Sequence, residues 1–317
     1  MYVATAPRKP RLQYIAVLSA AVMAIALPHL ATAQSEPDWV WVDGYEEFVS
    51  PPEAFRITTL VLRDPHVFVT TPPQPPLPAL CLDFTDTPIP TTTFSLNGQI
   101  AAALTTDGNT DGFLDTSTLI LFRPLDRTTP LARIEQVPAR CTAPVATTTC
   151  EPPVAPTPAT VDFIETRASG TCLAPLPATT GNQPVNPQFP PYSPSITNAT
   201  AQCFKTGVRN GTVGDIGLSL PLVDLQLAAS FAPEPTTQLV NGLIRGFLPE
   251  SAADAIQVPL PNPPGGTLTL SSLLPGGTGF CTGTFGAARQ NKDLYRGVPG
   301  WWFYFNFTAT RVPYSGP

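Results

Sequence analysis

Residues 301–310 read WWFYFNFTAT, the most aromatic stretch of the chain. Successive side chains of a β-strand point to opposite faces, so one face would carry Trp301, Phe303, Phe305 and Phe307, and the other Trp302, Tyr304, Asn306 and Thr308. A fully apolar face favours a strand that closes a hydrophobic core. A sugar-binding aromatic platform is the alternative use of such a stripe.

Other segments along the chain also alternate with a period of two, which is typical of half-buried strands. They are 39–43, 56–63, 66–70, 80–85, 94–104, 118–123, 217–231, 238–248 and 256–260. No long amphipathic helical pattern occurs between them. The sequence therefore predicts an all-β, disulfide-bonded fold with few helices, either a sandwich-like domain or two packed β-units.

Composition divides the chain into four parts. Residues 1–33 form a targeting segment, 34–130 a first β-rich part, 131–200 a Pro/Thr-rich connection and 201–317 a second β-rich part. Stretches such as 142–160 and 173–196 favour turns and polyproline conformations. We expect these Pro-rich loops to be held by disulfides.

The two β-rich parts share a short pattern, N-G-x-I-x-x-x-L. It begins at Asn97 in the first part and at Asn241 in the second. Self-similarity of this kind suggests a duplicated β-unit. The match covers four positions in each part.

The first 33 residues have the features of a cleavable secretory signal. Arg8, Lys9 and Arg11 precede the apolar run 14–27, and Ala31-Thr32-Ala33 follows it. Small residues at the −1 and −3 positions are those that signal peptidase recognises, and the apolar run is short for a membrane span. We expect cleavage before Gln34, a secreted, periplasmic or cell-surface protein, and no membrane span after cleavage.

The charge balance argues against nucleic acid as a partner. Residues 1–33 hold three of the 17 basic residues and none of the 23 acidic ones, so the rest carries 14 minus 23, or −9. Nucleic-acid-binding surfaces are basic. The expected partner is an unidentified glycan or protein of the envelope or the extracellular space.

Six cysteines follow the signal segment, an even number that predicts disulfides in an oxidising compartment. None belongs to a CxxC motif, so the sequence gives no support for zinc. Six cysteines allow 15 pairings. Proximity along the chain favours Cys141–Cys150 and Cys172–Cys203, which leaves Cys81–Cys281.

Residues 107–115, DGNTDGFLD, carry the most specific chemical pattern. Oxygen-bearing side chains at alternate positions before a glycine suit calcium. The stretch resembles the loops of EF-hand and dockerin proteins and the hairpin loops of integrin-type propellers. We expect a structural calcium ion, with the ligands Asp107, Asn109, Asp111, the Phe113 carbonyl and Asp115. Position 12 is Thr118, where an EF-hand has an acidic residue, and a metal-free turn is the alternative.

Catalytic motifs are scarce. His66 is the only histidine after residue 33, it lies in a strand pattern, and no G-x-S-x-G or H-E-x-x-H motif occurs. We therefore expect His66 to be structural. The leading hypothesis is an exported, calcium-stabilised binding or structural protein rather than an enzyme. The alternative is an exported hydrolase that uses a carboxylate pair, with glycans as substrates.

Overall fold

The computed structural model describes residues 52–70, 81–89, 92–127, 131–155, 159–181, 192–214, 219–232, 235–259, 267–279, 281 and 292–316. The chain divides into two compact units, Met1–Glu46 and Glu47–Pro317. All described residues belong to the second unit. The predicted signal segment and the strand predicted at 39–43 lie outside the described residues.

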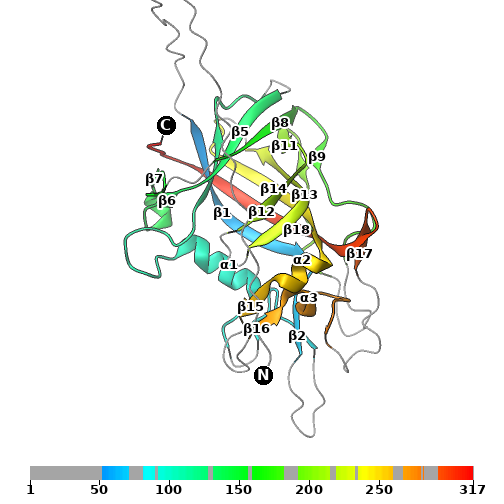
Figure 1. Ribbon diagram of the computed structural model, residues 1–317. Coiled ribbons are helices and arrows are strands. Elements are labelled where there is room, and N and C mark those ends of the chain that lie inside the picture. Colours follow the sequence, from blue (N-terminus) through cyan, green and yellow to red (C-terminus); the bar gives the residue numbers. More distant parts are fainter. Residues whose placement is uncertain are drawn as a thin grey trace, which may run out of the picture. The chain divides into compact units, whose positions relative to one another are not determined.

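Eight antiparallel strands of this unit form one closed sheet (Figure 1). In spatial order they are β1 (Glu53–Asp64), β4 (Thr118–Phe122), β5 (Leu131–Pro138), β8 (Thr160–Arg167), β11 (Cys203–Thr206), β13 (Leu220–Phe231), β14 (Gln238–Pro249) and β18 (Val298–Val312). The sheet closes because β18 pairs with β1, from Ala54 opposite Val312 to Asp64 opposite Tyr304. The prediction of an all-β fold is confirmed, whereas a closed sheet takes the place of the expected sandwich or pair of packed β-units.

Two of these strands, β5 and β8, lie in the segment 131–200 that we expected to be a connection. Their residues alternate less clearly than those of the predicted strands. In β8, Val161 and Phe163 are exposed and Ile164 is buried, so apolar side chains occupy both faces. A pattern search for one apolar and one polar face does not detect such a strand.

The interior of the closed sheet is filled by large apolar side chains. The rings of Phe55 and Phe204 both contact Phe122, with centroid separations of 5.6 and 5.4 Å. In β18, one face, comprising Trp301, Phe303, Phe305 and Phe307, belongs to the same core cluster. The aromatic stretch 301–310 is therefore a core strand, as predicted.

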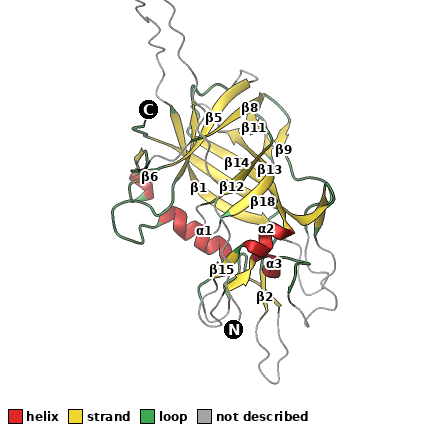
Figure 2. Ribbon diagram, viewed as in Figure 1, coloured by secondary structure: helices red, strands yellow, loops and turns green. Residues whose placement is uncertain are grey.

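The remaining elements are short (Figure 2). The helices are α1 (Leu96–Thr105), α2 (Glu250–Ala255), α3 (Leu270–Leu273) and a 3₁₀ turn, η1 (Val145–Thr147). The additional strands are β2 (Phe68–Thr70), β3 (Cys81–Asp83), β6 (Arg140–Cys141), β7 (Cys150–Glu151), β9 (Thr171–Leu173), β10 (Ala199–Thr200), β12 (Arg209–Val213), β15 (Gln257–Pro259), β16 (Thr267–Thr269) and β17 (Asp293–Tyr295). Helices α1, α2 and α3 lie at the same end of the closed sheet (Figure 1) and contribute buried residues to its core cluster.

Helix α1 corrects the strand predicted at 94–104. Ser95 is the N-cap, and its hydroxyl accepts a hydrogen bond from the Gly98 amide, which stabilises the first helical turn. Ile100 and Leu104 are spaced by four residues, so both face the core. The Asn97 side chain bonds to both the amide and the carbonyl of Leu62, at 2.8 and 3.0 Å. Strand β1 pairs with β4 only as far as Arg56. Beyond that point, helix α1 supplies hydrogen-bond partners for the backbone of Leu62.

All three predicted disulfides are present: Cys81–Cys281, Cys141–Cys150 and Cys172–Cys203. The last one joins β9 to β11 and packs against the outer face of β18 through Trp302 and Tyr304. Among the described helices, none has both the length and the apolar character that a membrane span requires.

Candidate functional site

A pocket of about 330 Å³ lies where the short strands β4, β5 and β8 end. Thr118, Pro138 and Thr160 mark these ends, because Thr118 pairs with Pro138 and Gln136 pairs with Thr160. The longer strands β1, β13 and β14 continue past this level and form the opposite side. The difference in strand length therefore leaves a space at the end of an otherwise filled interior, a common position for a ligand site.

The two sides of the pocket differ in chemistry. The long strands and α1 contribute aliphatic side chains: Ile57, Leu60, Leu104, Leu225, Leu227 and Ile244. The other side, from β4, β5, β8, β11, β12 and the residue Thr116 before β4, contributes the apolar Val137, Pro138 and Val213. It also carries the hydrogen-bonding groups of Thr116, Thr118, Gln136, Thr160, Thr206, Arg209 and Thr212. Such a pocket matches a ligand with one apolar and one polar side.

Arg209 forms an ion pair beside the pocket. Its Nε atom lies 2.8 Å from one Asp162 carboxylate oxygen and 3.1 Å from the other. Gln136 donates to the same carboxylate at 2.9 Å. Asp162 is only 7% exposed, so these bonds offset the cost of burying its charge.

This ion pair spans a gap in the wall of the sheet. Strand β8 pairs with β11 as far as Ile164 and Thr206, and the Gly207 amide then donates to the Phe163 carbonyl at 3.1 Å. Beyond this point β12 pairs with β13 instead, from Arg209 opposite Leu225 onward. In this gap the side chains of Arg209 and Asp162 connect β12 to β8, and no described backbone pairing joins these two strands.

A second anchored region adjoins the pocket at Arg56, which is fully buried. Its Nη2 group donates to the carbonyls of Leu104 and Thr116, and Nε donates to Ser117. Among the described residues, no group accepts a hydrogen bond from the Nη1 atom. Burial lowers the pKa of this guanidinium below its usual value. Because Leu104 and Thr116 both line the pocket, Arg56 fixes one of its edges.

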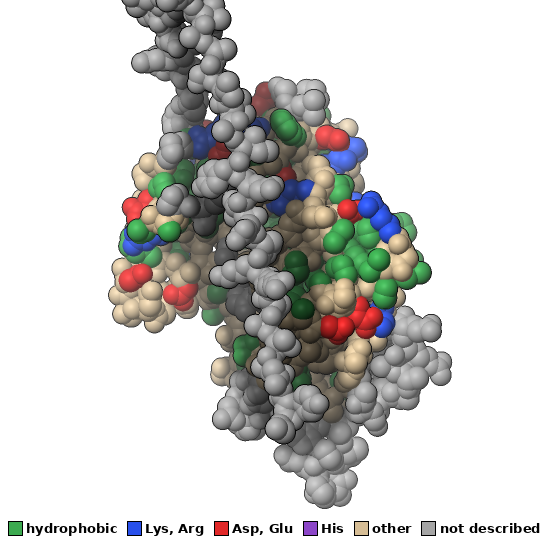
Figure 3. Space-filling view, in the orientation of Figure 1, with side chains coloured by type: hydrophobic (Ala, Val, Ile, Leu, Met, Phe, Trp, Pro, Cys, Tyr) green, Lys and Arg blue, Asp and Glu red, His purple; other side chains and the backbone are tan. Residues whose placement is uncertain are grey.

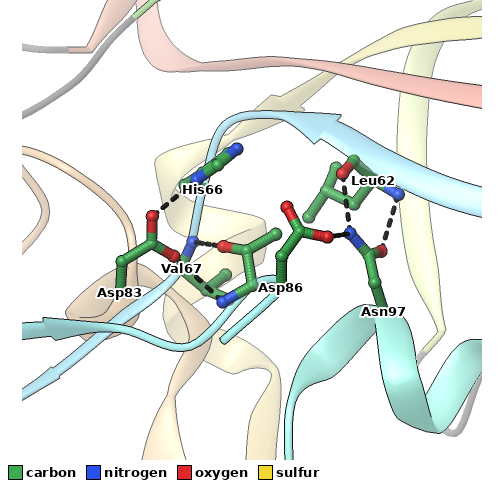
Figure 4. Close-up of polar contacts among 7 residues, drawn as sticks. Leu62, His66, Val67, Asp83, Asp86 and Asn97 are labelled. Carbon is green, nitrogen blue, oxygen red and sulfur yellow. Dashed lines mark hydrogen bonds and ion pairs between the residues drawn. The ribbon is translucent and has the colours of Figure 1, made fainter. Parts of the chain in front are cut away.

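His66 belongs to a separate polar cluster, shown in Figure 4. Its Nδ1 atom lies 2.6 Å from an oxygen of Asp83, and its ring stacks on Tyr192 with a centroid separation of 3.5 Å. The other oxygen of Asp83 accepts from the Thr85 amide. The Tyr192 hydroxyl bonds to the His66 backbone. Among the described hydrogen bonds of the His66 ring, none goes to a hydroxyl or thiol, so they give no nucleophile–histidine–carboxylate triad. The contacts instead join β1, β2 and β3.

The predicted calcium ligands lie on one exposed loop between α1 and β4. The Asp107 oxygens accept from the amides of Asp111 and Gly112, at 3.0 and 2.8 Å. Asp111 accepts from the Phe113 amide, and Asp115 accepts from the Gly108 amide. In the described part of the chain, no three His, Cys, Asp or Glu side chains form a group able to hold a metal ion.

Another predicted ligand, Asn109, also bonds within this loop: its side chain accepts from the Asp111 amide at 3.2 Å. Gly112 adopts a φ of +87°, which the turn requires and which glycine adopts without strain. The side-chain oxygens of Asp107, Asn109, Asp111 and Asp115 therefore bond within the loop, and calcium binding stays a prediction.

The pocket residues were not identified as a site from the sequence alone. Asp162 lies on β8 between the exposed Val161 and Phe163, and Gln136 lies on β5 between the buried Glu135 and the half-buried Val137. From the sequence we predict a strand at neither segment. The sequence does contain a signal for them: in 132–136 and 161–164, Gln136 and Asp162 are polar residues at the alternate positions that also hold Ile134 and Ile164. Searches against family models, curated proteins and solved structures found no match to this chain.

Proposed function

We propose that this chain is an exported, disulfide-bonded binding protein whose pocket at the end of the closed sheet holds a small ligand. The observation that carries the proposal is the pocket itself, with an aliphatic side and a hydrogen-bonding side. Ligand sites of β-barrels are commonly found in their mouths. The volume of about 330 Å³ is near the lower end of the range for small-molecule sites, roughly 300–1,000 Å³.

Export is supported by the disulfides and by the signal pattern. Three disulfides are typical of proteins that fold in oxidising compartments. Acidic and basic side chains are interspersed on the face shown in Figure 3. Such a surface does not favour a highly charged polymer as the partner.

A binding role has more support than the carboxylate-pair hydrolase. Such a hydrolase needs two Asp or Glu side chains on either side of the scissile bond, about 5–10 Å apart. Among the described residues that line the pocket there is neither Asp nor Glu. Asp162 contacts lining residues but is already bonded to Arg209 and Gln136.

A fragment screen followed by methyl NMR tests the proposal. With isoleucine δ1 methyl groups labelled, a ligand in the pocket should shift Ile57 and Ile244, which line it, and leave Ile89 unchanged. The Leu227→Phe substitution should fill part of the pocket and weaken binding at least tenfold. The matched Leu268→Phe, on β16 outside the pocket, should not.

The proposal would be wrong if no fragment shifted the two pocket methyl groups. It would also be wrong if Leu227→Phe, shown to be folded by its methyl spectrum, bound every fragment as the unmodified protein does. Thermal unfolding gives a second measurement, since a ligand that binds only the folded state raises Tm.

A further inference from the structure

The charges around the pocket restrict the class of ligand. Arg209 is the only charged residue among the described lining residues. Its Nε atom bonds to Asp162, so this pair contributes no net charge. The remaining polar lining groups are the Gln136 side-chain amide and threonine hydroxyls, all uncharged.

Arg209 still has donors to offer. A guanidinium carries five N–H donors, and four of them are on the terminal Nη1 and Nη2 atoms. Among the described residues, only the Nε donor of Arg209 has a hydrogen-bond acceptor. A donor removed from water needs an acceptor, so a ligand that fills the pocket would have to present an oxygen to these terminal groups.

The same geometry disfavours an anionic ligand. A carboxylate bound to the terminal nitrogens would compete with Asp162 for one guanidinium and would leave the site with a net charge of −1. Where a bound ligand shields the site from water, an uncompensated charge is costly. A carbonyl or hydroxyl oxygen accepts the same hydrogen bonds without adding a charge.

We infer that the pocket takes a small uncharged amphiphile. Its carbonyl or hydroxyl oxygen bonds to Arg209 and to neighbouring polar groups such as Gln136, and its hydrocarbon body packs on the aliphatic side formed by Leu60, Leu227 and Ile244. Asp162 determines this preference, because it neutralises Arg209. The inference rests on the proposed function, and it adds the chemical class of the ligand.

Two isosteric probes, hexanamide and hexanoate, test this inference at pH 8, where the acid is ionised. Isothermal titration calorimetry should give a Kd for hexanamide at least tenfold lower than that for hexanoate. In Asp162→Asn the cation is no longer neutralised, so the order should reverse. In Arg209→Gln hexanoate should bind even more weakly, because Asp162 is then uncompensated, and this variant serves if Asp162→Asn does not fold.

The outcomes separate the two claims. Tighter binding of hexanoate by the unmodified protein, or an unchanged ratio of the two Kd values in a folded variant, would overturn the inference and leave the proposed function standing. If neither probe binds but other fragments shift the Ile57 and Ile244 methyl groups, the assigned ligand class is wrong. If nothing binds in the pocket, both claims fail.

Discussion

The Nε atom of the fully buried Arg56 donates to the Ser117 hydroxyl at 3.0 Å, which joins β1 to the residue that precedes β4. The same guanidinium donates to the carbonyls of Leu104 and Thr116. One side chain thus holds both ends of the loop that contains the predicted calcium ligands. No carboxylate accepts from Arg56 among the described hydrogen bonds, so neutral oxygens solvate its charge.

We therefore expect Arg56→Lys to destabilise the protein. A lysine ammonium cannot reproduce the planar fork that reaches three acceptors on two segments. Leaving one or two buried acceptors unpaired costs about 1–3 kcal/mol of unfolding free energy. Urea unfolding measures the loss, and Arg133→Lys, whose side chain is 53% exposed, is the matched control with an expected change within about 0.5 kcal/mol. Equal losses in both variants would contradict the role assigned to Arg56.

Asp64 should make stability depend on pH. Burial raises the pKa of this carboxyl to about 7, with a further increase from the Asp293 carboxylate, against the opposing effect of the Gly181 amide hydrogen bond. The unfolded chain has a pKa near 3.9 at this residue. Between about pH 4 and pH 7 the folded state therefore retains a proton that the unfolded state releases, so stability falls as the pH rises through this window.

The Asp64→Asn variant should lose this dependence. From pH 4 to pH 7 the unfolding free energy of the variant should rise relative to that of the unmodified protein, by up to about 4 kcal/mol. Above pH 8 this difference should stay constant. Urea unfolding at each pH gives the two curves. Parallel curves across this range would show that Asp64 titrates normally.

Calcium should bind the loop 107–115 and raise the melting temperature. Millimolar affinity is sufficient for an extracellular module, and a ligand at 100 times its Kd adds about 2.7 kcal/mol to stability. For the ion to bind, Asp107 and Asp111 must exchange their bonds to loop amides for bonds to the metal. Asp111→Ala should abolish the effect, and Glu165→Ala, an equal charge change on the exposed part of β8, should retain it.

If calorimetry detects no heat of binding at millimolar calcium, and chelator leaves the melting temperature unchanged, the loop is a metal-free turn.

The disulfides should differ in their contribution to stability. Cys81 and Cys281 are 200 residues apart, whereas Cys141 and Cys150 are 9 apart. The loop-entropy relation gives about 5 and about 3 kcal/mol for these separations, and cross-linking by the other two bridges shortens the longer loop. Replacing the first pair by alanine should therefore cost more than replacing the second, by up to about 2 kcal/mol in urea unfolding. The reverse order would show that native contacts, rather than chain entropy, determine the effect.

Local patterns in the sequence predicted a large part of the fold. In residues 301–310, Trp301, Phe303, Phe305 and Phe307 share one face and lie in the core, because successive side chains of a strand point to opposite faces. The other face is also buried, where Trp302 and Tyr304 pack against the Cys172–Cys203 disulfide. Short separations along the chain also indicated Cys141–Cys150 and Cys172–Cys203, and Cys81–Cys281 followed as the remaining pair. These features depend on neighbouring residues, which the sequence displays directly.

The tertiary structure decided what the shared pattern N-G-x-I-x-x-x-L becomes. From Asn97 it forms helix α1, because Ser95 caps it and Asn97 bonds to Leu62 of β1. From Asn241 it forms part of β14, because β13 and β18 pair with it on both sides. The same four residues therefore give different structures, since contacts with distant segments outweigh the weak local preference.

The closure of the sheet and the pocket were likewise decided by distant contacts. The sequence by itself indicated the all-β class, the cysteine pairing and the core strand at 301–310. The pairing of β1 with β18 joins residues about 250 apart, and the site brings together Gln136, Asp162 and Arg209 from three strands. Pairing partners and strand ends depend on how the whole sheet closes, and no local pattern encodes that closure.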